Sequence, residues 1–387
     1  MRNTNNSDNV INVLIEVANT GDDVAQNNLG VCYYAGDMTE IDYTQATFWF
    51  NKSAEQGNTE AQKNLGTCYF HGTGVAQDYF QSVNWYTKSA EQGDKEAQNE
   101  LGHCYYWGYG VEQNFGVAVR WFSASALQEN PNAQFSLGEC YYNGYGVERD
   151  YNHAIKWLRL SADQGIPEAQ YRVGVCLDFG HGVEQNHQEA TKWYTLSANQ
   201  GFALAQNNLG VCYLHGLGVK QNTESALLWF GKAIKQSDEN ALYNLGCCYL
   251  QGDVIEQDYK KAFELFSAAS EKGHVSAFVN LGNCHSKGWG VTQDFNKAFS
   301  WYKKAAEQDD ADGQCNLATY YYDGKGTNQS YSLAVEWLKK SVAQGHDEAQ
   351  YKLGLCYLLG NCYKMSKKKR TPKAILIKGI KCNLKFK

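Results

Sequence analysis

A short pattern that recurs at a fixed interval constrains the fold of this chain more than any other feature. One copy reads Ala61-Gln-Lys-Asn-Leu-Gly-Thr-Cys-Tyr69, and near copies follow along the sequence. The apolar residue before the central glycine recurs every 36 residues without insertion, at Leu29, Leu65, Leu101, Leu137, Val173, Leu209, Leu245, Leu281, Leu317 and Leu353. Such a period is typical of a solenoid, whose units bury their apolar faces only by stacking on neighbours.

Each unit reads as a pair of helices. The first, helix A, spans about Glu60 to Tyr69 in one copy, where Ala61, Leu65 and Cys68 share one face at helical spacing. Gly72 is predicted to end this helix as a left-handed cap. A Gly-x-Gly-Val connector follows in most units, and an Asp or Asn then caps a second helix, helix B. Helix B carries a tryptophan in eight units.

The glycine inside helix A predicts close packing. A helix-interior glycine costs about 1 kcal/mol relative to alanine, yet it stands in nine of ten units, as at Gly102, and Ala318 replaces it in the tenth. We therefore expect a large side chain of helix B to press against the backbone of helix A at this position.

The thirteen cysteines form a regular pattern rather than a chemical motif. Nine of them occupy one register, namely Cys32, Cys68, Cys104, Cys140, Cys176, Cys212, Cys248, Cys284 and Cys356. Equivalent helices of adjacent units are separated by another helix, and packed helices lie about 8–10 Å apart, beyond the roughly 7 Å limit for the Cα atoms of a disulfide. We therefore predict small buried packing residues, without disulfide, redox or metal chemistry.

Charge is divided unevenly along the chain. Residues 361–387 hold ten Lys or Arg and no acid, which leaves 25 basic and 41 acidic residues in 1–360, a net charge of −16. An acidic array disfavours nucleic-acid binding by the solenoid. No apolar run approaches the roughly 18 residues of a transmembrane helix, and the start lacks a signal-type apolar core, so we predict a cytoplasmic protein. Lys367-Lys-Lys-Arg370 offers a nuclear-import patch as an alternative.

The combined pattern, Ala-x-x-x-Leu-Gly-x-x-Tyr-x-x-Gly-x-Gly-Val-x-x-Asp followed by Ala-x-x-Trp-x-x-Lys-Ser-Ala-x-Gln-Gly, resembles the Sel1-like repeat over about residues 8–360. The resemblance implies an all-α, right-handed α-solenoid of antiparallel helix pairs, similar to tetratricopeptide arrays and often called HCP-like. We expect a capping half repeat at 1–22, about nine full units and a final helix A at 23–360, and a disordered basic tail at 361–387.

The resemblance also implies a scaffold that binds partner proteins, and no catalytic constellation argues against this. Ser300-Trp-Tyr-Lys303 has the spacing of serine acyl-enzymes, but it stands inside a predicted helix B without the accompanying motifs. We predict no enzyme activity and no cofactor. One alternative is an adaptor of a membrane-associated complex, in endoplasmic-reticulum degradation or cell-wall synthase regulation. Another is a β-lactamase-like hydrolase, as claimed for cysteine-rich relatives with two cysteines per unit.

Variation among the ten copies indicates where a partner binds. The positions two before the leucine and two, five and six after it fall on one face of helix A. The resemblance to tetratricopeptide units places that face on a concave wall. In the middle units the candidate residues are Lys63, His71, His103, Trp107, Phe135, Glu139, Tyr171, Asp178, Phe179 and His215. The alternative is that these rings only pack against the neighbouring helix A.

Overall fold

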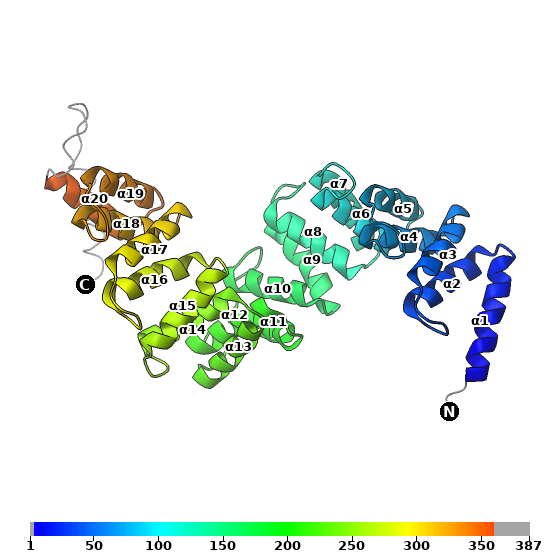
Figure 1. The fold of residues 1–387 in the computed structure, drawn as a ribbon, viewed down its shortest axis with the longest axis horizontal. Helices are drawn as coiled ribbons and strands as arrows, with labels where there is room; N and C mark the ends of the chain where they lie inside the picture. The colour runs from blue at the N-terminus through cyan, green and yellow to red at the C-terminus, as the bar shows by residue number, and fades with distance from the viewer. Residues whose placement is uncertain (1–3, 360–387) are drawn as a thin grey trace. The chain divides into compact units, whose positions relative to one another are not determined.

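The structure, a computed structural model, describes residues 4–359, and every regular element in that range is an α-helix. The predictions for the tail 361–387, including the basic patch, and for the last capping glycine, Gly360, lie outside the described residues. The chain divides into two compact units, 1–200 and 201–387. The uninterrupted 36-residue period carries no signal of this division. Figure 1 shows the order of the helices in each unit.

The first unit begins with α1 (Thr4–Asn19) and continues with alternating A and B helices. Its A helices are α2 (Asp23–Ala35), α4 (Thr59–His71), α6 (Lys95–Trp107), α8 (Pro131–Asn143) and α10 (Pro167–Phe179). Its B helices are α3 (Tyr43–Glu55), α5 (Tyr79–Glu91), α7 (Phe115–Ala126), α9 (Tyr151–Asp163) and α11 (His187–Asn199).

The second unit repeats this alternation and ends on an A helix. Its A helices are α12 (Ala203–His215), α14 (Glu239–Gln251), α16 (Val275–Lys287), α18 (Ala311–Asp323) and α20 (Asp347–Leu358). Its B helices are α13 (Thr223–Lys235), α15 (Tyr259–Glu271), α17 (Phe295–Glu307) and α19 (Tyr331–Ala343).

The helix ends have the predicted caps. Before α5, the Asp78 carboxylate accepts a hydrogen bond from the Gln81 amide at 3.0 Å. After α4, Gly72 adopts the left-handed conformation with φ of 71° and donates its amide hydrogen to the Cys68 carbonyl. The same two caps, an Asp or Asn before helix B and a glycine after helix A, recur at 36-residue spacing. Each unit therefore encodes the ends of its own helices.

Helix B and the helix A that follows it share a core, so neighbouring repeats interlock. Val83 and Tyr86 of α5 pack with Leu101 and Cys104 of α6. The predicted close approach within a repeat is confirmed: a Cβ added at Gly102 would lie 2.6 Å from the Phe122 ring. Equivalent pairs are Gly30 with Phe50, Gly66 with Tyr86, Gly138 with Leu158, Gly174 with Tyr194, Gly210 with Phe230, Gly246 with Phe266, and Gly282 with Tyr302.

A ladder of buried polar contacts accompanies this core. The Gln92 side-chain amide donates to the Gln62 side-chain oxygen at 2.8 Å, and the Gln62 amide donates to the Ala54 carbonyl of the preceding helix at 3.1 Å. The Ser89 hydroxyl donates to the Thr59 carbonyl at 2.9 Å. These contacts recur in most units and satisfy polar groups that are costly to bury alone.

The nine cysteines of the column are all buried and free, as predicted. Burial raises the pKa of the Cys284 thiol to about 12, and burial with the nearby charge of Glu100 does the same for Cys104. Since the thiolate is the reactive form, burial and the raised pKa both disfavour reaction of these thiols at neutral pH. Their burial is consistent with the predicted packing role.

We expect a thiol reagent at pH 7.5 to modify few of the thirteen cysteines in the native protein and all of them after denaturation. The cysteines of the column are buried, so the reagent cannot reach them. Burial also raises their pKa values above the ordinary thiol value, so the thiols are protonated. Mass spectrometry of the labelled protein gives the count. Rapid native labelling of most column cysteines would contradict the packing role.

Candidate functional site

Four of the ten predicted partner-binding residues line one pocket between α6 and α8, in the first compact unit. The pocket has a volume of about 200 Å³. Its lining residues are His103, Tyr106 and Trp107 from α6, Phe122 from α7, and Phe135, Ser136 and Glu139 from α8. The prediction included His103, Trp107, Phe135 and Glu139. Tyr106 is a pocket residue that the sequence prediction missed, although it stands five residues after Leu101, at a position of the predicted face.

Aromatic rings form most of the pocket wall. Tyr106 and Trp107 meet edge to face with ring centroids 4.8 Å apart, and His103 meets Phe122 in the same way at 4.9 Å. Phe122 is almost completely buried, whereas Trp107, the last residue of α6, is 59% exposed. The pocket therefore has a rigid floor and an exposed indole at its edge, which suits the side chain of an apolar ligand.

The pocket is nearly neutral at physiological pH. Burial lowers the pKa of His103, which favours the neutral imidazole, and burial raises the pKa of Tyr106 to about 12. Glu139 is bound by Arg172 of α10 through two hydrogen bonds, from Nε to Oε1 at 2.6 Å and from Nη2 to Oε2 at 2.8 Å. Arg172 also lies over the ring of Tyr142, 4.9 Å from its centroid. Because Glu139 has a bidentate partner, the pocket does not demand a cationic ligand.

The other six predicted residues lie outside this pocket. Lys63, Tyr171 and Asp178 are half-buried, and His71, Phe179 and His215 are exposed, with His215 in the second compact unit. Asp178 contacts Nδ1 of His187 at 2.6 Å and accepts a hydrogen bond from the Tyr194 hydroxyl at 3.3 Å. Phe179 is 65% exposed and stacks on His181 with centroids 5.8 Å apart. Asp178 is thus occupied by internal contacts, while Phe179 remains available as a contact surface.

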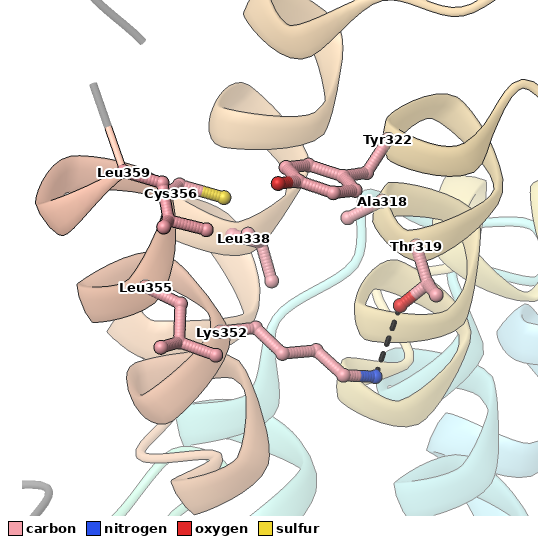
Figure 2. A pocket seen from close by; sticks show the side chains of 8 residues that line it. All are labelled: Ala318, Thr319, Tyr322, Leu338, Lys352, Leu355, Cys356 and Leu359. Atoms are coloured by element: carbon pink, nitrogen blue, oxygen red, sulfur yellow. Dashed lines mark hydrogen bonds between the residues drawn. The ribbon is translucent and has the colours of Figure 1, made fainter. Parts of the chain in front are cut away.

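A second pocket occupies the same register of the repeat in the second compact unit, between α18 and α20. It has a volume of about 170 Å³, and Figure 2 shows its lining residues. Thr319 and Tyr322 stand six periods after His103 and Tyr106, and Leu338 stands six periods after Phe122. Two pairs of successive A helices therefore form a pocket at the same register of the repeat, and the side chains at variable positions give the two pockets different chemistry.

Neither metal nor acyl-enzyme chemistry finds support within residues 4–359. No three His, Cys, Asp or Glu side chains in this range are grouped so that they could hold a metal ion. The Ser300 hydroxyl donates to the Asn296 carbonyl within α17, and Lys303 pairs with Glu307 at 3.7 Å on the exposed helix surface. None of the described helices combines the length and apolarity needed to cross a membrane.

The repeats match a known family along almost the whole chain. The Sel1 repeat model matches ten segments, at residues 23–58, 59–94, 95–130, 131–166, 167–202, 203–238, 240–274, 277–310, 311–346 and 347–369. The chain belongs to the Sel1 repeat family. No curated protein sequence matches it.

Two solved Sel1 repeat structures resemble this Sel1 repeat protein over most of its length. A protective antigen of uropathogenic Escherichia coli that displays an SLR fold is 36% identical, with a TM-score of 0.73, and the match covers 95% of this chain and 78% of the antigen. A Sel1 repeat protein from Oxalobacter formigenes is 31% identical, with a TM-score of 0.61, covering 79% of this chain and 89% of its own. The predicted fold class, an all-α solenoid of helix pairs, is confirmed.

Proposed function

We propose that this Sel1 repeat protein is a non-catalytic scaffold that binds segments of partner proteins on the helix A face of its first unit. The observation that carries the proposal is the α6/α8 pocket, which brings together four residues selected from the sequence as partner contacts. We place the protein in the cytoplasm, and we assign no nucleic-acid binding to its acidic solenoid.

The pocket favours a peptide with a large apolar or aromatic side chain as its anchor. Exposed Trp107 and the buried ring of Phe122 both line the pocket and supply contact area for such a group. Tryptophan and tyrosine are frequent anchors of interfaces, and truncating one costs on the order of 2 kcal/mol or more. Phe179, exposed at the end of α10, supplies a further ring on the same predicted face of helix A.

The proposal is tested by selecting peptides from a displayed random library on the full chain and measuring the affinity of the best binder by fluorescence anisotropy. We expect selected peptides to share an aromatic or large aliphatic residue. Replacing Trp107 and Phe179 together with alanine should weaken binding at least tenfold, because both rings are exposed and offer contact area to a ligand. Within the protein each loses one ring contact, with Tyr106 and with His181.

Two exposed helix B residues serve as matched controls. Arg120→Ala and Lys156→Ala change α7 and α9, away from the pocket lining, and should leave the affinity within about twofold. The thermal unfolding of every variant is measured in parallel, and we expect little change for Trp107→Ala and Phe179→Ala. Loss of binding in the helix B variants with retained binding in the double variant would move the interaction surface to the opposite face.

A further inference from the structure

The α18/α20 pocket has apolar walls at the end of the described chain. Ala318, Leu338 and Leu355 contribute aliphatic surface, and Tyr322 closes one side (Figure 2). Leu359, the last described residue, also lines it and is 61% exposed. Exposed apolar surface of this kind is costly in water and favours a covering segment.

The one charged side chain in the wall is already paired. The Lys352 ammonium donates to the Thr319 hydroxyl at 2.9 Å, which Figure 2 shows, and pairs with Glu348 at 2.7 Å. Because Lys352 has both partners, the pocket does not select an anionic ligand. An aliphatic ligand matches the remaining surface.

We infer that this pocket binds the chain's own apolar segment Ala374-Ile-Leu-Ile377, independently of the peptide-binding role proposed above. Residues 360–387 begin directly after the pocket residue Leu359 and contain this run of four consecutive apolar residues. The fourteen residues 360–373 span at most about 50 Å when extended, more than the short return to the pocket requires.

Charge complementarity supports the same occupant. Residues 361–387 carry ten basic side chains and no acid, against a net charge of −16 in residues 1–360. The exposed carboxylates nearest the pocket, Glu348 and Asp312, already pair with Lys352 and His346, so the attraction comes from the net charge of the array. An array with a net negative charge attracts a Lys-rich segment of the same chain and raises its local concentration near the folded repeats.

The repeat register explains why this segment would bind as a separate ligand rather than as an eleventh unit. Lys373 stands where helix B of other units carries tryptophan, and Pro372 precedes it within the expected helix. Ala374 to Ile377 therefore lack the spacing of a further helix B, but they supply aliphatic side chains of the size that the pocket accepts.

Hydrogen exchange of the full chain tests the inference. The variant Ile375→Asp, Leu376→Asp, Ile377→Asp should exchange the amides of α20 about tenfold faster or more, because uncovering the terminal helix favours its local opening. Exchange in α2 to α10 should not change. Adding a synthetic peptide of residues 371–387 to this variant should restore the protection of α20.

The matched control is the variant Ile380→Asp, Leu384→Asp, Phe386→Asp, which adds the same charge to the same tail. The amide exchange rates of α20 in this variant should stay within about twofold of those in the wild type. Three results would overturn the inference. They are unchanged α20 exchange in the first variant, an equal effect in the control, and protection that depends on protein concentration together with a doubled mass in sedimentation. The last result would assign the pocket to a second copy of the chain.

Discussion

Deleting residues 77–94 is expected to abolish cooperative folding of the first compact unit, whereas deleting residues 59–94 leaves a helical, cooperatively folding protein. The shorter deletion removes α5 with its capping residue Asp78, and Leu101 and Cys104 of α6 lose their packing partners. The loss amounts to several kcal/mol, a large part of the 5–15 kcal/mol that stabilises a typical domain.

The longer deletion preserves the repeat because it removes one whole period. Asn58, which caps α4, then precedes α6 in place of Asp94, and Leu101 takes the place of Leu65 against α3. Urea unfolding followed by circular dichroism distinguishes the two proteins. Equal tolerance of both deletions would show that the 36-residue segment is not the folding unit.

Replacing Gly102 with alanine is expected to destabilise the protein by about 2 kcal/mol, although alanine is the better helix former. The new methyl group would lie 2.6 Å from two carbon atoms of the Phe122 ring, and Phe122 is too deeply buried to move aside. Chemical denaturation gives the free-energy change. Gly116→Ala in α7 is the control, because its methyl group meets only ordinary contacts, and it should be neutral or stabilising.

Another repeat of the chain suggests a second substitution that should restore stability to the Gly102→Ala variant. In the unit formed by α18 and α19, Ala318 replaces the glycine and Leu338 replaces the aromatic residue. Combining Gly102→Ala with Phe122→Leu should therefore cost at least about 1 kcal/mol less than the sum of the two single changes. Additive effects would mean that the strain at Gly102 has another origin.

Local sequence predicted the helices well because each boundary is encoded within a few residues. Asp78 and Gly72 satisfy backbone groups that any helix leaves unpaired at its ends, so their positions mark the same boundary in every copy. The glycine at 102 predicted a close approach of helix B for an equally local reason, since only a nearby side chain justifies its cost. The buried cysteine column followed from helical periodicity.

The candidate site was predictable only in part. Register placed Asn99 and Phe135 at equivalent positions of helix A, yet Asn99 is buried, whereas Phe135 lines the α6/α8 pocket. A register position fixes the direction of a side chain on its helix, but exposure depends on the size of the side chains that the next helices bring beside it.

The sequence by itself determined the repeat, its helix pairs, their caps and the closely packed glycine, because these depend on contacts that every copy makes in the same way. Tertiary structure decided which variable residues meet. Glu139 is neutralised by Arg172, 33 residues later, and Tyr106 and Phe122 join the pocket from two different helices. These contacts depend on the separation and rotation of neighbouring helices, which arise from the packing of many side chains together and appear in no single stretch of sequence.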